Sequence, residues 1–285
     1  MTITAACGAG FALLRLTASN HPHILPFVAD TSIANLPIPI VTLTTDLGLD
    51  DWYVAAMKAV LLSHAPAARL VDVTHTIGQG DIIKGSITLE RAIASFPPAT
   101  IHLAVIDPTV GSDRRPLIVR IHQQLIVCPD NGLITWANRR LGPFEAYQIT
   151  WKPPASSQTF HGRDLFAPVA GMLASFRAIL DLAKPISDPM LLDLHLSTGK
   201  SGQIIHIDHF GNATTNIPAA AVPPNAQLQV GNLTLPLRRT YSDVASGQPL
   251  ALIGSSELLE IAVRDGSAAA LIPLKLDDLV TLAAK

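Results

Sequence analysis

The sequence predicts an α/β domain with a mostly parallel sheet, followed by a small all-β domain of barrel or sandwich type. Two observations carry this expectation. Across residues 38–184, short β-branched runs alternate with segments of helical period, which is typical of strands joined by crossover helices. From residue 201 to residue 285, short strand-like runs are separated by turn residues, which is typical of barrels and sandwiches.

The elements of the first domain follow from these runs and from the residues that end them. The expected strands are short and rich in β-branched residues, as buried strands are. Proline ends two expected helices, at positions 66 and 97, and Asp81 can cap the second helix. The expected strands cover residues 40–44, 69–73, 100–106, 117–121 and 125–128, and the expected helices cover residues 52–64 and the segment between Asp81 and Pro97.

The second domain is expected over residues 201–285, after a linker over residues 185–200 that contains proline, serine and glycine. Gly231 and Asn232 separate two short apolar runs, which favours a hairpin. The expected strands cover residues 203–207, 226–230, 233–237, 249–253, 258–263 and 279–283.

The first 37 residues are expected to be an extension, either flexible or translated upstream of a misassigned start. A signal peptide is disfavoured because no basic residue precedes the apolar run at residues 11–16.

Composition limits the class of function. Of 285 residues, 48% are hydrophobic and 15% are charged, so the chain can bury a large core. The net charge of −2 and the lack of a basic stripe predict no nucleic-acid partner. No apolar run reaches the ~20 residues of a membrane helix. The two cysteines, Cys7 and Cys128, form no CxxC pair, so a reduced cytoplasmic setting is expected.

Polar residues follow the expected strands at four places. They are Asp46, His75, Asp107 and the pair Asp130-Asn131. Because ligands of open α/β sheets bind at the carboxyl ends of strands, a shared site is expected there. His161 lies at the mouth of a further expected helix, in Phe160-His161-Gly162-Arg163-Asp164. Alone, His161 and Asp164 would be read as helix caps.

The second domain carries its own polar motifs. They are Asp208-His209-Phe210-Gly211-Asn212 and Gly254-Ser255-Ser256-Glu257. The ten histidines are scattered, and His206 and His209 lie on or beside a strand, so no metal site is expected.

These motifs, taken together, resemble those of the S-adenosyl-L-methionine (SAM) hydroxide adenosyltransferases, relatives of the SAM-dependent fluorinase and chlorinase. The resemblance runs from about Pro39 to the C-terminus and rests on six motifs in the same order. The motifs are Thr44-Thr45-Asp46-Leu47-Gly48, Val73-Thr74-His75 with Asp81-Ile82, Asp107-Pro108-x-Val110-Gly111-x-x-Arg114, Pro129-Asp130-Asn131-Gly132, the His161 motif above, and Asp208-x-Phe210-Gly211-Asn212 with Thr215-Asn216.

The resemblance implies a reaction in which water or hydroxide attacks the ribose C5′ of SAM and yields adenosine and L-methionine. SAM would be the substrate, so no cofactor is expected. The residues implied to activate water are Asp107, Arg114 and His161. Asp107 would accept a hydrogen from the water, Arg114 would stabilise developing negative charge, and His161 would orient the water or take its proton.

Further residues are implied to hold the substrate, in a homotrimer whose sites lie between the large domain of one subunit and the small domain of another. Asp46 would bind the ribose hydroxyls and Ser255 the methionyl carboxylate. The remaining residues are Asp51 and Asp208 for the methionyl ammonium, Phe210 for the adenine or ribose, and Asn212 for the adenine edge.

Differences from the halogenating relatives favour water as the nucleophile. The fluorinase has Tyr in place of Asp107 and Tyr-Ser in place of His161-Gly162, so the halide-binding hydroxyl is missing here. A carboxylate at position 107 would also repel a halide anion. Other departures are Thr109 in place of the usual Gly, Ser256 in place of the Arg of the fluorinase, and Val263-Arg264-Asp265-Gly266 in place of Val-Asn-x-Gly.

Three other functions remain open from the sequence. One is a chlorinase-like halogenase. Another is a calcium-dependent nucleoside hydrolase, because Asp46-x-Gly48-x-Asp50-Asp51 resembles part of that metal motif, although Thr44 replaces its first Asp. The third is a protein that binds adenosine or SAM without catalysis, which would not need the Asp107, Arg114 and His161 trio.

Overall fold

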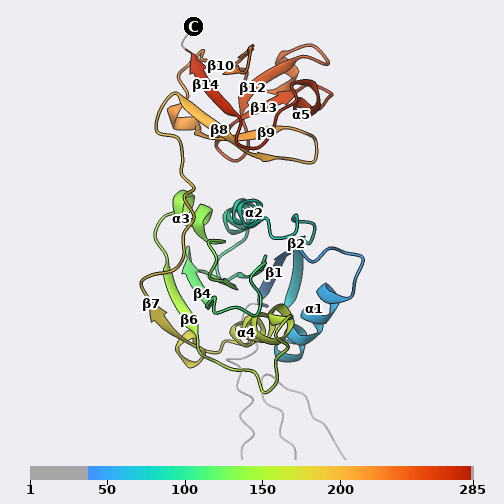
Figure 1. The fold of residues 1–285 in the computed structure, drawn as a ribbon, viewed down its shortest axis with the longest axis vertical. Helices are drawn as coiled ribbons and strands as arrows, with labels where there is room; N and C mark the ends of the chain where they lie inside the picture. Colours follow the sequence, from blue (N-terminus) through green and yellow to red (C-terminus); the bar gives the residue numbers. More distant parts are fainter. Residues whose placement is uncertain (1–37, 284–285) are drawn as a thin grey trace, which may run out of the picture. The chain divides into compact units, whose positions relative to one another are not determined.

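The computed structural model describes residues 38–283 of the chain. The expected extension over residues 1–37 lies outside the described residues. Two seven-stranded sheets form, one in an N-terminal α/β domain and one in a C-terminal all-β domain (Figure 1). The exact domain limits expected from the sequence stay a prediction.

The first sheet is mixed, and the expected parallel arrangement holds for only part of it. Its strand order is β2-β1-β3-β5-β4-β6-β7, with β2, β1, β3 and β5 parallel and the pairs of β4 with β5, β4 with β6, and β6 with β7 antiparallel. The change of direction occurs between β4 and β5. His122 and Gln123, with φ of 46° and 61°, form the two-residue turn between these strands, and such a turn joins only antiparallel neighbours. The strands are β1 (Ile40–Thr45), β2 (Arg69–Thr74), β3 (Ile101–Val105), β4 (Pro116–Ile121), β5 (Gln124–Pro129), β6 (Glu145–Ile149) and β7 (Ala183–Ile186).

Helices cover both faces of this sheet (Figure 1). Leu103 and Val105 of β3 belong to a core shared with α1 and α4, whereas Ala104 and Ile106 belong to a core shared with α2 and α3. This alternation is the period of two that a strand imposes on its side chains. Asp81 caps α2 as expected, accepting a hydrogen bond from the backbone N of Lys84. The helices are α1 (Tyr53–His64), α2 (Ile82–Ser95), α3 (Thr135–Leu141) and α4 (Ala167–Ala174), with a π-helical turn at Gly162–Phe166 and a 3-10 turn at Ile179–Asp181.

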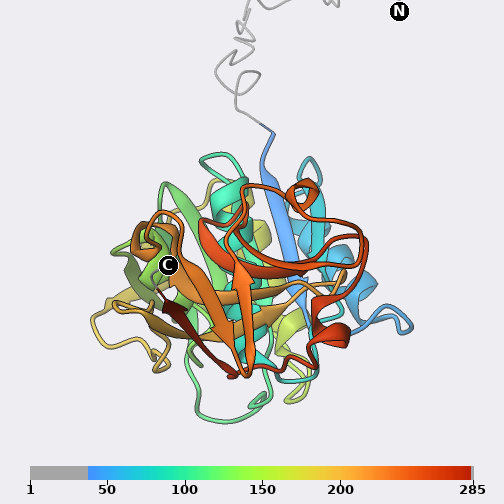
Figure 2. The same cartoon turned by 90° about the horizontal axis from the view of Figure 1, so that it is seen from above.

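The second sheet is antiparallel throughout and nearly closed. Its order is β11-β10-β14-β8-β9-β13-β12, and its edges approach each other at a bridge between Leu237 and Ala251. The curvature can be followed in the orange and red strands of Figure 2. The strands are β8 (Ser201–Ile207), β9 (Ala213–Pro218), β10 (Gln227–Val230), β11 (Leu233–Pro236), β12 (Pro249–Ile253), β13 (Leu258–Val263) and β14 (Leu279–Ala283), with short helical turns at Ala219–Ala221, Tyr241–Asp243 and α5 (Ala268–Leu271).

Strand β9 was not expected from the sequence, because its polar residues read as a loop motif. Thr215 and Asn216 are nevertheless buried, at 0% and 3% exposure. Thr215 donates a hydrogen bond to the carbonyl of Leu259 at 2.8 Å, so its hydroxyl is satisfied inside the sheet. Polar residues on a central strand are stable when their hydrogen bonds are made internally.

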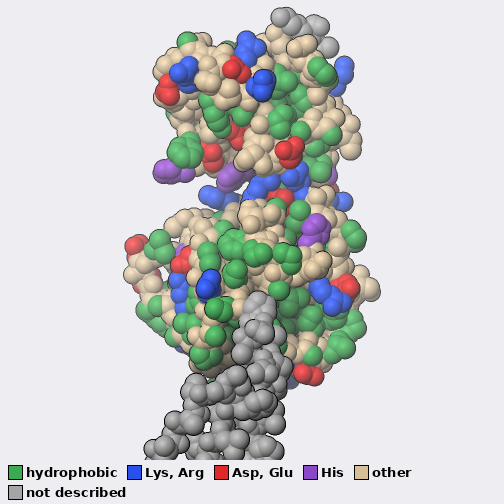
Figure 3. Space-filling model, turned by 180° about the vertical axis from the view of Figure 1, so that it is seen from behind, with side chains coloured by type: hydrophobic (Ala, Val, Ile, Leu, Met, Phe, Trp, Pro, Cys, Tyr) green, Lys and Arg blue, Asp and Glu red, His purple; other side chains and the backbone are tan. Residues whose placement is uncertain are grey.

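Surface charge is mixed on the face shown in Figure 3, where basic and acidic side chains are interspersed with hydrophobic ones. Within residues 38–283 the structure has no helix of the length and apolar character that crossing a bilayer requires.

Candidate active site

A small pocket of about 70 Å³ opens beside the carboxyl ends of β1 and β3. Three segments that lie far apart in the sequence form its wall. These are the residues after β1, the end of β3 with its following loop, and the segment that enters α4. The pocket is lined by Asp46, Leu47, Val105, Asp107, Val110, Thr159, Phe160, His161 and Gly162.

Asp107 and Arg114 form a fixed ion pair at this pocket. Nε of Arg114 donates to Oδ1 and Oδ2 of Asp107 at 3.0 and 2.9 Å, and the two side chains are only 5% and 7% exposed. The guanidinium lies 5.2 Å from the ring centroid of Phe166, and Thr109 Oγ1 donates to Asp107 Oδ1 at 3.3 Å. Because Asp107 and the Phe166 ring both contact it, the planar guanidinium has little freedom to move.

His161 joins this pair through its Nδ1 atom. Nη2 of Arg114 donates a hydrogen bond to Nδ1 of His161 at 2.7 Å. Because arginine stays protonated in proteins, Nδ1 must be the acceptor, and the proton of the neutral ring lies on Nε2. Burial, and then the positive charge of Arg114, lower the pKa of His161 below its ordinary value. The structure therefore brings Asp107, Arg114 and His161 together, with the imidazole neutral at pH 7.

Neither His161 nor Asp164 caps the helix by its side chain. His161 precedes the π-helical turn without a side-chain capping bond. Asp164 instead accepts a hydrogen bond from the backbone N of Ser157 at 2.7 Å and pairs with Arg163. The segment is thus held by Asp164, which leaves the His161 ring for Arg114 and the pocket.

Asp46 lines the same pocket. Its Oδ2 accepts a hydrogen bond from the backbone N of Gly80 at 2.8 Å. Burial raises the pKa of Asp46, and the negative charge of Asp107 raises it further, while the Gly80 contact acts in the opposite direction. Two carboxylates, those of Asp46 and Asp107, therefore line one small pocket. Of the two, Asp107 is the one paired with the guanidinium of Arg114.

Two glycines allow the loops of the site to approach each other. Gly111 has a φ of +84°, and a Cβ there would lie 2.7 Å from the carbonyl oxygen of Gln158. Gly80 has a φ of +70°, and a Cβ would lie 3.2 Å from Cβ of Pro108. The left-handed residue of the Asp107 loop is Gly111, so Thr109 carries no such strain.

Five residues implied to hold substrate lie elsewhere in the chain. Asp51 is exposed beyond β1, and Ser255 lines a separate depression with Arg91. Asp208 closes a local turn, in which its Oδ1 accepts hydrogen bonds from the backbone N of Phe210 at 2.9 Å and of Asn212 at 2.8 Å. Phe210 is 72% exposed. A single chain thus does not gather Asp51, Asp208, Phe210, Asn212 and Ser255 at the pocket.

Asp130 and Asn131 follow a strand, as expected, but they support the fold. Nδ2 of Asn131 donates to the carbonyl of Ile106 at 2.8 Å, directly before Asp107. Asp130 accepts hydrogen bonds from Nε of Arg115 and from the backbone N of Met190, both at 2.7 Å. The strand-end pattern could not distinguish a side chain that enters the pocket from one that holds a neighbouring segment.

The apolar lining of the pocket was missed for a related reason. Leu47 and Val110 stand in the quoted motifs but have no chemical signature that would assign them to a pocket wall. Gly80, whose backbone N contacts Asp46, carried a weak signal as a glycine between a strand and a helix cap.

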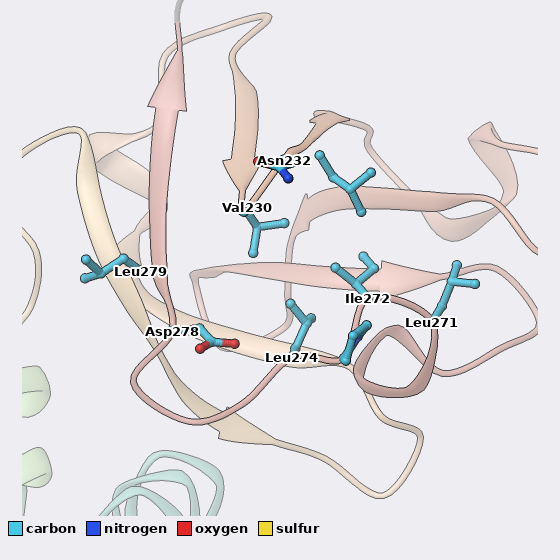
Figure 4. Close-up of a pocket in the computed structure, with 10 residues that line it drawn as sticks. Val230, Asn232, Leu271, Ile272, Leu274, Asp278 and Leu279 are labelled. Atoms are coloured by element: carbon cyan, nitrogen blue, oxygen red, sulfur yellow. The ribbon is translucent and has the colours of Figure 1, made fainter.

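A larger cavity of about 440 Å³ lies in the second domain (Figure 4). Apolar side chains such as Val230, Ile272 and Leu274 line it, with one carboxylate, Asp278. Oδ2 of Asp278 accepts a hydrogen bond from the backbone N of Lys275 at 2.7 Å. The lining therefore holds no pair of titratable groups. Within residues 38–283, no three His, Cys, Asp or Glu side chains are grouped as a metal ion would need.

Comparison with known proteins matches both domains. A model of the SAM hydroxide adenosyltransferase N-terminal domain matches residues 41–183, and a model of the corresponding C-terminal domain matches residues 202–281. The chain is 36% identical over 247 residues to an (R)-S-adenosyl-L-methionine hydrolase from Salinispora tropica, covering 83% of this chain and 94% of that protein.

Two further relatives extend this result. A fluorinase from Actinoplanes sp. is 28% identical over 269 residues, covering 79% of this chain and 90% of that protein. The crystal structure of an uncharacterized conserved protein from Thermotoga maritima aligns with a TM-score of 0.80 at 31% identity, covering 86% of this chain and 100% of that one. Because the two domain models match in order and together cover most of residues 41–281, the chain belongs to the SAM hydroxide adenosyltransferase family.

Proposed function

We propose that the protein hydrolyses SAM to adenosine and L-methionine. The observation that carries the proposal is the Arg114 guanidinium, which contacts both Asp107 and His161 beside a glycine at position 162. A carboxylate and a neutral imidazole suit a water molecule, whereas a halide would meet the Asp107 charge and no hydroxyl at Gly162. The hydrolase relative supports the same reaction.

The geometry supports distinct roles for the three residues. Because Nδ1 of His161 accepts from Arg114, its Nε2–H is the group available to donate to the oxygen of a water molecule. Asp107 accepts a hydrogen from that water, and Arg114 offsets the charge that gathers on the oxygen. His161 therefore orients the water, and Asp107 is the acceptor of its proton.

The bond changes need no further catalyst. The water oxygen forms a bond to C5′ of the ribose as the C5′–S bond breaks, and the electron pair of that bond returns to sulfur. The sulfonium leaves as the neutral thioether of methionine, so no general acid is required. Positioning of the water in a desolvated pocket is then the main contribution of the protein.

Substrate binding requires more than one chain in this proposal. A pocket of about 70 Å³ is far smaller than the roughly 300–1,000 Å³ of ligand sites. We propose a homotrimer in which the small domain of a neighbour completes the site. Asp46 binds the ribose hydroxyls from its own subunit. The other assigned groups are Asp51 and Asp208 for the ammonium, Ser255 for the carboxylate, and Phe210 and Asn212 for the adenosine.

The expected setting is the cytoplasm, where SAM is made and thiols stay reduced. Within the described residues, Cys128 is a free and fully buried thiol, and burial raises its pKa. Such a thiol is a core residue with little nucleophilic character.

Analysis of the products formed from SAM tests the proposal. Purified protein should release adenosine and methionine in equal amounts, and in ¹⁸O-labelled water the label should appear in the 5′-hydroxyl of adenosine. High chloride should yield no 5′-chloro nucleoside, and EDTA should not change the rate. A halogenated nucleoside, release of free adenine that EDTA abolishes, or binding without turnover would each replace the proposal with one of the other functions.

A further inference from the structure

A series of polar side chains lies behind the loop that carries Asp46. Oγ1 of Thr45 lies 2.8 Å from Nδ1 of His75, and both residues are buried, at 0% and 3% exposure. On the other side of the imidazole, Nε2 lies 3.1 Å from Oδ1 of Asp72. Oδ2 of Asp72 accepts a hydrogen bond from Nζ of Lys58 at 2.6 Å. The contacts thus connect the partly exposed Lys58–Asp72 ion pair, through His75, to Thr45, the residue directly before Asp46.

The carboxylate of Asp72 sets the direction of these contacts, because it can only accept and so favours a proton on Nε2 of His75. Nδ1 of His75 is then the acceptor for Oγ1 of Thr45, which itself accepts a hydrogen bond from the backbone N of Leu47 at 3.3 Å. The imidazole proton then lies on Nε2, facing Asp72. That contact is short but is not aligned as a hydrogen bond, so it acts as an electrostatic attraction that favours this tautomer.

Backbone contacts hold the same loop from two further directions. The backbone N of Gly48 donates to the carbonyl oxygen of His75 at 2.8 Å, and that of Gly80 donates to Oδ2 of Asp46 at 2.8 Å. The register of β1 with β2 shifts just before Thr44, so regular pairing with β2 ends where these contacts begin. Beyond Thr45, which still pairs with Val105 of β3, the contacts of Thr45, His75 and Gly80 therefore hold the loop that carries the Asp46 carboxylate.

We propose that Thr45 and His75 are positioning residues, which act through Asp46 on recognition of the ribose diol. The inference rests on the proposed function, in which Asp46 binds the two ribose hydroxyls. A carboxylate that accepts two hydrogen bonds in one plane must be held in a narrow range of angles. Neither Thr45 nor His75 lines the pocket, so each acts without touching the substrate.

The chain offers an internal control for this inference. Oγ1 of Thr42, on the same strand, lies 2.8 Å from Nδ1 of His102, and both residues are fully buried. Nε2 of His102 contacts Oε1 of Gln124, and Nε2 of Gln124 donates to the carbonyl of Ile93 at 2.9 Å. None of these residues lines the pocket. Loss of the Thr42 hydroxyl should therefore remove a similar buried contact without affecting Asp46.

Binding of two nucleosides to the full-length protein tests the inference. Dissociation constants for adenosine and 2′,3′-dideoxyadenosine would be measured by calorimetry. The wild type should prefer adenosine by at least about tenfold, because the diol contributes hydrogen bonds to a charged group. Asp46→Asn should reduce this preference, and Thr45→Val and His75→Phe should reduce it to less than about threefold. Thr45→Ser, which keeps the hydroxyl, and Thr42→Val should retain it.

The outcomes separate failure of the inference from failure of the ribose assignment. If the wild type shows no preference, or if Asp46→Asn retains it, Asp46 does not read the diol and both proposals about this residue fall. If Asp46→Asn loses the preference while Thr45→Val and His75→Phe keep it, the positioning role alone is wrong. Equal loss in Thr42→Val would show that the effect comes from general destabilisation, which would also overturn the positioning role.

Discussion

Arg114 donates a hydrogen bond from Nη2 to Nδ1 of His161 over 2.7 Å. This single contact fixes the tautomer of His161, because an arginine donor requires a lone pair on Nδ1. In the neutral ring, Nε2 of His161 therefore already carries a proton and cannot accept one from water. The division of roles between His161 and Asp107 follows from this contact.

The pH dependence of turnover should reflect the lowered pKa of His161. Burial and Arg114 both disfavour the imidazolium, so the active neutral form persists below the ordinary pKa of about 6.5. We expect kcat to stay level as the pH falls through 6.5 and to decline only at lower pH, when Nδ1 is protonated and the Arg114 contact is lost. An acid limb centred at or above 6.5 in the pH–kcat profile would contradict this assignment.

Substitution of Arg114 by Lys should test the need for a fixed, forked cation. Lysine keeps the charge but cannot contact Asp107 and His161 together. We expect kcat to fall by about 10²–10³, as for loss of one preorganised donor, while the dissociation constant of SAM changes much less. Arg120→Lys is a matched control, because Arg120 pairs with Glu145 on the exposed surface and should leave kcat unchanged. Equal kcat values in both variants would refute the role of Arg114.

Two inactive variants should restore activity when they assemble together, if sites lie between subunits. Asp107→Ala removes a group of the large domain, and Asp208→Ala removes one of the small domain. Co-expressed in one trimer, they should form some sites with neither change, and turnover should return to a fraction of the wild-type value. Activity no higher than that of the separate variants would indicate that each chain forms its own site.

Asn131 should stabilise both the fold and the position of Asp107. Asn131→Ala leaves the buried carbonyl of Ile106 without the amide that now lies 2.8 Å away. An unsatisfied buried acceptor costs about 1–3 kcal/mol, so the free energy of unfolding in urea should fall by that amount. We also expect kcat to fall, because Ile106 directly precedes Asp107. Unchanged stability would mean that water or a rearranged side chain satisfies the carbonyl.

Gly171 should be required for the packing of α4 on α1. A Cβ at this position would lie 2.7 Å from both the carbonyl oxygen of Leu61 and Cβ of His64. Gly171→Ala should therefore lower the free energy of unfolding by about 1–3 kcal/mol through overpacking. Gly199→Ala, where nothing lies within 4 Å of the new Cβ, should change it by less than about 0.5 kcal/mol. Similar effects at both positions would argue against the close helix contact.

The trio at the pocket was identified through family resemblance, and the structure brings its members into contact. The polar strand ends alone indicated only that some site lies there. They grouped Asp130 and Asn131 with Asp46 and Asp107, although the first two hold neighbouring segments. Position after a strand depends on local sequence, whereas the direction of the side chain depends on what packs against it.

By itself, the sequence determined most of the strands and helices, because periodicity, proline and capping act within a few residues, but it did not indicate β6, β7, β9 or α3. It also determined the residue types of the site. Only the tertiary structure decided that the first sheet is mixed and that polar β9 lies inside a sheet. The tertiary structure alone also decided that Arg114 fixes the tautomer of His161 and that Thr45, the residue before Asp46, contacts His75. The contacts of Arg114 with His161 and of Thr45 with His75 join residues 47 and 30 positions apart, and chain packing, not local pattern, sets such distances.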